Sequence, residues 1–115
     1  MLVDFLWEHC TYLHQENTKE DVRKEVTNDL YHRHIVYTTD EKGLTGVCRF
    51  SIYGDLSRIL DVAVRYDKRG SGILEDLLKY GLTLYPSVKA LQFHSISKKR
   101  EFTIPVRYLK INKEK

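Results

Sequence analysis

One stretch of the chain, residues 59–74, constrains the fold more than any other. Its sequence, ILDVAVRYDKRGSGIL, begins as an apolar strand, continues through a charged turn with two glycines, and ends at the start of a helix. At such a junction the first N–H groups of the helix have no intrahelical partner, and glycine lets an anion approach them closely. The order of elements therefore predicts an anion-binding loop in an α/β fold.

Two common glycine loops do not fit this stretch. A Walker-type loop needs Lys followed by Ser or Thr after its second glycine, but Ile73 and Leu74 stand there. A dinucleotide-binding fingerprint needs a third glycine where the chain has Glu75. The loop is therefore either of another type or an ordinary strand-to-helix turn.

The run from Arg69 to Gly72 begins five residues after Val64 and precedes an apolar helix. This pattern resembles the acetyl-CoA loop of the GNAT N-acetyltransferase superfamily, which reads Arg/Gln-x-x-Gly-x-Gly/Ala after a strand. Arg69 and Gly72 match its spacing, and Leu74 stands where the pattern has a small residue. The resemblance covers roughly residues 44–95 and implies a GNAT-like fold.

Two helices are predicted before this region. An apolar stripe recurs every three to four residues and predicts a helix over about residues 3–15, with the stripe formed by Leu2, Leu6, Cys10 and Leu13. Thr18, followed by Asp21, is a typical N-cap for a second helix that ends near residue 31. The resemblance implies the same order, since in GNAT enzymes two initial helices flank the acceptor site.

The remaining segments predict a mixed sheet. Residues 34–38 and 44–53 form a predicted hairpin, and residues 58–66 the strand that leads into the loop. A helix over 73–85 and a parallel strand over 88–96 follow. Residues 102–111 are expected to be extended, with Pro105 confining them to a sheet edge or marking a break. The expected fold class is α/β with a mixed sheet, as one GNAT-like domain over residues 1–115: two N-terminal helices, an antiparallel meander, then strand, loop, helix and strand.

Charge is distributed unevenly along the chain. Residues 1–57 carry ten acidic and six basic side chains, a balance of −4, whereas residues 58–115 carry six and thirteen, a balance of +7. The basic half contains the glycine loop and suits a ligand with several phosphates, either coenzyme A or a nucleic acid. The run Lys98-Lys99-Arg100, with Phe102 and Tyr108 nearby, supports the second reading but matches no known nucleic-acid-binding signature.

Composition predicts a cytoplasmic protein. No apolar run reaches membrane-spanning length, and the first residues lack the pattern of a secretory signal. Cys10 and Cys48 are therefore expected to be small buried side chains rather than a disulfide. A metal site is not predicted, because the histidines and Cys10 form no known metal motif; the nearest candidate set is His9, Cys10, His14, His32 and His34.

The resemblance implies roles for individual residues. Backbone groups of Val64, Arg65 and Tyr66 would bind the pantetheine arm of acetyl-CoA and polarise its thioester. The amides of the loop would hold the diphosphate, namely those of Arg69, Gly70, Ser71, Gly72 and Ile73. Asp61 is the candidate base for the acceptor amine and Tyr108 the candidate acid for the departing thiolate. The structural alternatives are an ion pair of Asp61 with Arg58 or Arg65, and a packing role for Tyr108.

The resulting hypothesis is an acetyl-CoA-dependent N-acetyltransferase whose acceptor is an amine-bearing small molecule or a protein. Two alternatives remain open from the sequence. One is a GNAT-like binding module without catalysis, of a kind that a phage could encode, which Leu74 and the short C-terminal part favour. The other is a nucleic-acid-binding protein that uses the basic half of the chain. The sequence does not indicate an oligomeric state.

Overall fold

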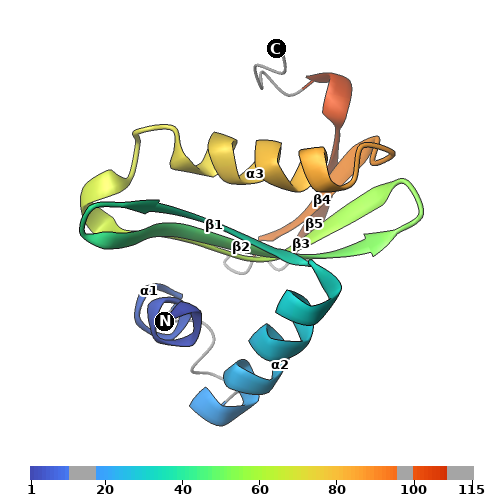
Figure 1. Cartoon of the computed structure of the whole chain (residues 1–115). Coiled ribbons are helices and arrows are strands. Elements are labelled where there is room, and N and C mark those ends of the chain that lie inside the picture. The colour runs from blue at the N-terminus through green and yellow to red at the C-terminus, as the bar shows by residue number, and fades with distance from the viewer. Residues whose placement is uncertain (11–17, 96–99, 109–115) are drawn as a thin grey trace.

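The computed structural model describes residues 1–10, 18–95 and 100–108. These residues form three layers, with one helix above a five-stranded sheet and two helices below it (Figure 1). The elements in chain order are α1 (Leu2–His9), α2 (Lys19–His32), β1 (Ile35–Asp40), β2 (Gly43–Tyr53), β3 (Leu56–Val64), the 3-10 turn η2 (Tyr66–Lys68), α3 (Ile73–Leu84), β4 (Ala90–Ser95), β5 (Arg100–Pro105) and the 3-10 turn η3 (Val106–Tyr108).

The two N-terminal helices are confirmed, with a difference in length. α1 ends at His9 because Cys10 leaves helical geometry, with φ −116° and ψ 79°, and residues 11–15 of the predicted helix lie outside the described residues. α2 begins with the predicted capping box: the Asp21 N–H donates to Thr18 Oγ1, and the Thr18 N–H donates to the Asp21 carboxylate.

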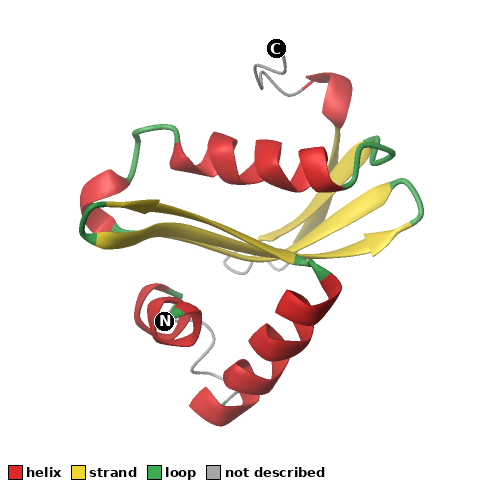
Figure 2. Cartoon of the chain, viewed as in Figure 1, coloured by secondary structure: helices red, strands yellow, loops and turns green. Residues whose placement is uncertain are grey.

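The sheet has the strand order β1-β2-β3-β4-β5 and is mixed, as predicted (Figure 2). β1, β2 and β3 form an antiparallel meander, β4 lies parallel to β3, and β5 returns antiparallel to β4 at the edge. β3 ends at Val64 rather than near Tyr66, since Tyr66 opens the η2 turn. The mixed α/β fold class is therefore confirmed. Of the extended segment predicted over residues 102–111, residues 102–105 belong to the edge strand β5, but Val106–Tyr108 form the η3 turn instead, and residues 109–111 lie outside the described residues.

Two apolar clusters hold the layers together, one on each face of the sheet. Below the sheet, Leu6 of α1 and Val22 of α2 pack in one cluster with Val47 of β2 and Ala63 of β3. Above it, the apolar face of α3 packs on Cys48, Phe50 and Leu91. Both cysteines are buried, as expected, and they do not form a disulfide with each other. Among the described residues, no helix is long and apolar enough to cross a membrane.

Candidate functional site

The strands β3 and β4 part shortly after they meet. β3 pairs with β2 along its whole length, but it pairs with β4 at only three positions, Leu56 to Arg58. Just beyond these pairs β3 carries a bulge, because Arg49 opposes Asp61 while Phe50 opposes Ile59, which leaves Leu60 as the extra residue. A bulge bends its strand and increases the local twist. The C-terminal half of β3 therefore has an edge that β4 does not cover.

The backbone of this open edge can be oriented from the strand ladder. The Arg65 N–H donates to the Thr45 carbonyl at 2.8 Å, so Arg65 faces β2. In an antiparallel ladder such residues alternate with residues that face away, so the N–H and C=O groups of Val64 and Val62 point to the open edge. Consistent with this, the Val62 carbonyl accepts from Cys10 Sγ at 3.4 Å and the Val64 carbonyl accepts from Arg69 Nε at 3.3 Å. Among the described residues, the N–H groups of Val62 and Val64 have no partner.

The glycine loop brings a second set of free donors to the same place. Gly70 and Gly72 adopt positive φ, 81° and 90°, and Gly72 is the N-cap of α3. The first helical bond is donated by Asp76 to the Gly72 carbonyl. Within the loop and the first turn of α3, five N–H groups have no partner among the described residues: those of Gly70, Gly72, Ile73, Leu74 and Glu75.

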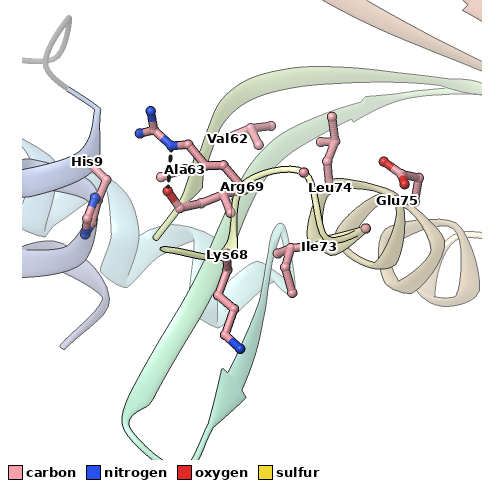
Figure 3. A pocket seen from close by; sticks show the side chains of 11 residues that line it. His9, Val62, Ala63, Lys68, Arg69, Ile73, Leu74 and Glu75 are labelled. Carbon is pink, nitrogen blue, oxygen red and sulfur yellow. Dashed lines mark hydrogen bonds between the residues drawn. The ribbon is translucent and has the colours of Figure 1, made fainter. Parts of the chain in front are cut away.

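A cavity of about 450 Å³ joins the open edge of β3 to this loop (Figure 3). It is lined by backbone and side chains from four places: the end of α1, the end of β3, the loop, and the first turn of α3. The lining residues are His9, Val62, Ala63, Val64, Lys68, Arg69, Gly70, Gly72, Ile73, Leu74 and Glu75. Leu74 forms part of the wall, and the volume of about 450 Å³ remains with its side chain in place.

The charges at the cavity are of both signs. The Arg69 guanidinium lies 4.7 Å from the centre of the Tyr66 ring, and its Nε–H donates a hydrogen bond to the Val64 carbonyl. Lys68 points toward the β1–β2 hairpin, where its Nζ lies 3.8 Å from Asp40 Oδ2 (Figure 3). Glu75 places a carboxylate in the first turn of α3, where negative charge is favourable but would also compete with a bound anion.

Five of the eight predicted cofactor-binding residues line the cavity: Val64, Arg69, Gly70, Gly72 and Ile73. Arg65, Tyr66 and Ser71 do not. The Arg65 guanidinium is turned away and binds Asp40 at 2.6 Å and Asp67 at 2.7 Å. The Ser71 hydroxyl donates to the Lys68 carbonyl within the loop.

Asp61, the predicted base, does not line the cavity. Asp61 is buried, 4% exposed, and pairs with Arg49, which also binds Asp29 and Glu25 at 2.7 Å each. The predicted pairing of Asp61 with Arg58 or Arg65 is replaced by this pairing with Arg49, because the bulge at Leu60 turns Asp61 to the face covered by α2. The side chain of Tyr108 lies outside the described residues.

The cluster around Arg49 is a structural feature of its own. Burial by itself lowers the pKa of Arg49, but the Asp61, Asp29 and Glu25 carboxylates more than offset this, so its pKa is raised. The cluster ties α2 to β2 and β3 at the level of the bulge. We interpret it as an anchor for the strand that forms the cavity.

Six of the lining residues had no predicted binding role: His9, Val62, Ala63, Lys68, Leu74 and Glu75. His9 was considered only as a metal ligand. Among the described residues, no group of three or more His, Cys, Asp or Glu side chains is placed to hold a metal ion. His14 of the candidate metal set lies outside the described residues. The sequence carries no signal for a binding role of His9, because its place at the cavity depends on the packing of α1 on the sheet, where Cys10 contacts Val62.

No protein-family model matches the sequence, and no curated protein matches it in sequence. Solved structures do match. A GNAT family N-acetyltransferase from Escherichia coli in complex with CoA is 17% identical, with a TM-score of 0.56 over 82% of this chain and 55% of that one. Tetrahymena GCN5 is 15% identical, with a TM-score of 0.58 over 84% of this chain and 62% of that one.

A third match is N-acetylglutamate synthase from Neisseria gonorrhoeae, complexed with coenzyme A and N-acetyl-glutamate. It is 15% identical, with a TM-score of 0.55 over 70% of this chain and 19% of that one. The chain thus spans between 19% and 62% of the length of these three structures. Identities of this size show the fold and not the activity. The layers, the parted strands and these matches together show that this chain has the GNAT fold, as the loop sequence predicted.

Proposed function

We propose that this chain binds an acyl-coenzyme A, with acetyl-CoA as the expected cosubstrate, and transfers the acyl group to an amine. One observation carries the proposal. The free N–H groups of Val62 and Val64 and the free N–H groups of the glycine loop open on the same cavity of about 450 Å³. Such a cavity suits a ligand with an extended amide-bearing arm at one end and a phosphorylated group at the other.

The loop end suits the diphosphate. Five N–H donors converge there, from Gly70, Gly72 and the first turn of α3, and the positive end of the helix dipole adds to them. Arg69 lies beside the loop and can reach an anion if its side chain leaves the Val64 carbonyl. The GNAT complexes with CoA cited above support this assignment by analogy of fold.

The strand end suits the pantetheine arm and the thioester. The arm is extended and carries two amides, so it can pair with the uncovered edge of β3 as an added strand would. The Val62 or Val64 N–H is then a donor for the thioester carbonyl. A fixed donor aimed at this oxygen stabilises the negative charge that develops there during acyl transfer.

The chemistry is direct transfer. A neutral amine attacks the thioester carbonyl carbon, a C–N bond forms, the C–S bond breaks, and the electron pair of that bond leaves on sulfur. The thiolate takes up one proton and the amine nitrogen loses one, so the protons balance. Asp61 is not included in this scheme, since its carboxylate is buried against Arg49.

The acceptor is proposed only as a class. An amine-bearing small molecule and an amine on a protein both fit the chemistry, and the part of the chain that the structure describes does not separate them. A panel of primary amines, amino acids, polyamines and lysine peptides would identify the class that is acetylated.

The test measures CoA binding with a matched pair of glycine variants. Gly72 and Gly54 both have positive φ, 90° and 64°, so a side chain at either position costs about 1–2 kcal/mol of backbone strain. Only Gly72 lines the cavity, whereas Gly54 lies in the turn between β2 and β3. We expect Gly72→Leu to weaken CoA binding at least tenfold by calorimetry and Gly54→Leu to leave it unchanged. Absence of CoA binding to the unchanged protein would refute the proposal.

A second candidate function is CoA binding without catalysis, and one observation favours it. Asp61, the candidate base, is buried against Arg49 and does not line the cavity that would hold CoA. If the protein binds CoA and no member of the amine panel is acetylated, this candidate replaces transfer. Salt-dependent binding of DNA or RNA without CoA binding would instead favour the nucleic-acid reading of the basic half.

A further inference from the structure

His9 lies where two cavities meet. It lines the 450 Å³ cavity at the glycine loop and also a second cavity of about 620 Å³ between α1, the β1–β2 turn and η2. Within the described residues it is the one residue common to the linings of these two. Figure 3 shows it at the end of α1, on the opposite side of the first cavity from Leu74 and Glu75.

The local structure holds His9 in this position. Cys10, the next residue, donates its Sγ hydrogen to the Val62 carbonyl at 3.4 Å, which fixes the end of α1 against the open edge of β3. The His9 ring packs on Phe5, with the ring centres 4.5 Å apart, and its side chain is only 14% exposed. The imidazole is therefore positioned by contacts on its own helix and close to the strand that would carry the thioester.

We propose that His9 takes the proton from the acceptor amine, which reaches the thioester through the 620 Å³ cavity. This inference rests on the acyl transfer proposed above. The cosubstrate would occupy the loop cavity and the amine the second one, so the two reactants would meet beside His9. The ammonium gives one proton to an imidazole nitrogen, the neutral amine attacks, and the imidazolium returns the proton to water in the open second cavity.

The carboxylates around these cavities are less suited to the task. Glu8 lines the second cavity but its side chain is 77% exposed, so it is not held in one position as His9 is. Asp4 pairs with Lys19 at 2.6 Å and Asp67 with Arg65 at 2.7 Å, and these partners lower the pKa of both carboxyls, which makes them weaker bases. Glu75 lies at the loop end, away from the second cavity.

The charged groups nearest to His9 come from several elements. On α1, the Glu8 Oε2 atom lies 3.8 Å from the His9 Nε2 atom. Lys42 and Arg65 line the second cavity, and Lys68 and Arg69 line the first. Imidazole is the side chain that most often serves as a base near neutral pH.

The experiment compares His9→Gln with a matched control, His94→Gln. His94 is exposed on β4, is not part of either cavity lining, and lies opposite Glu101 on the edge strand. CoA affinity, kcat and KM for an active amine are measured from pH 6 to pH 10. We expect His9→Gln to keep CoA affinity within about twofold and to lower kcat at pH 7 by about 100-fold or more. The loss should shrink toward pH 10, where the amine loses its proton unaided.

The control and a second variant make the outcomes decisive. His94→Gln should match the unchanged protein throughout. His9→Ala should regain part of its kcat when free imidazole is added, which a merely structural role of His9 would not allow. If the unchanged protein acetylates an amine and His9→Gln retains kcat within threefold at pH 7, this inference is wrong while the proposed function stands. If the unchanged protein shows no transfer to any amine, both are wrong.

Discussion

Replacement of Arg49 by methionine tests whether the ion pairs of the buried Arg49 with its carboxylates stabilise the folded protein. Arg49 is 4% exposed and binds three carboxylates, of which Asp61 and Asp29 are buried as well. Arg49→Met keeps most of the side-chain volume but leaves those two carboxylates without their cation. Removal of one partner from a buried ion pair typically costs about 3–5 kcal/mol, mostly as the penalty of the uncompensated charge.

The third carboxylate gives an internal comparison. The Glu25 side chain is 53% exposed, so its bond to Arg49 is screened by water, and Glu25→Gln should cost less than about 1 kcal/mol. Asp61→Asn keeps an acceptor for Arg49 and two other carboxylates, and should fall between the two, at roughly 1–3 kcal/mol. The expected order of destabilisation is therefore Arg49→Met, Asp61→Asn, Glu25→Gln.

The assay is urea unfolding at pH 7, followed by far-ultraviolet circular dichroism, with thermal unfolding as a second measure. At about 4 °C per kcal/mol, Arg49→Met should lower Tm by roughly 12–20 °C. The double variant Arg49→Met/Asp61→Leu should be more stable than Arg49→Met alone, because it removes one of the stranded charges. The reasoning is refuted if Arg49→Met lies within about 1 kcal/mol of the unchanged protein.

Three further predictions follow from single contacts. Gly46→Ala should destabilise the protein by about 1–3 kcal/mol and weaken CoA binding, because its Cβ would lie 2.5 Å from Ile73 Cγ2 at the start of α3. A free energy of unfolding in urea equal to that of the unchanged protein would contradict this. Cys48 should resist a thiol reagent at pH 8 until the protein unfolds, because burial raises its pKa to about 12. The hydrogen bond from Arg65 lowers the pKa of Asp40 to about 2, so the stability from this pair is complete above about pH 4 and lost as pH falls through 2; in Arg65→Gln the Asp40 midpoint in an NMR titration should rise toward about 3.9.

Much of the fold was predictable because local signals agreed with it. The capping box at Thr18 fixed the start of α2, and the alternation of residues 34–53 gave the first hairpin. The strand, loop and helix around Gly72 then determined the parallel crossover to β4. Boundaries were less predictable, because the sequence pattern around Cys10 and Tyr66 does not show where the backbone leaves helical or extended geometry.

The candidate site was only partly predictable, for a reason that lies in the sheet. The sequence places Asp61 three residues before Val64, on what would be one regular strand, but the bulge at Leu60 changes which residues of β3 share a face. Asp61 is therefore turned to Arg49, a partner 12 residues away in sequence. His9 was missed because its proximity to Val62 depends on how α1 docks on the sheet, which no local pattern encodes.

The short contact between β3 and β4 has a mechanical consequence. Within the described residues, β3 and β4 share three ladder pairs, and the Lys89 and Ala90 N–H groups bond to the Asp55 carbonyl at the same end. The meander β1-β2-β3 and the hairpin β4-β5 are therefore joined at one end of the sheet and separate toward the other. Amide hydrogens of β4 and β5 should exchange with solvent sooner than those of β2, whose neighbours protect it on both sides. A thioester arm seated between the separated strands would bridge them, and slower deuterium uptake in β4 would report its arrival without any chemical step.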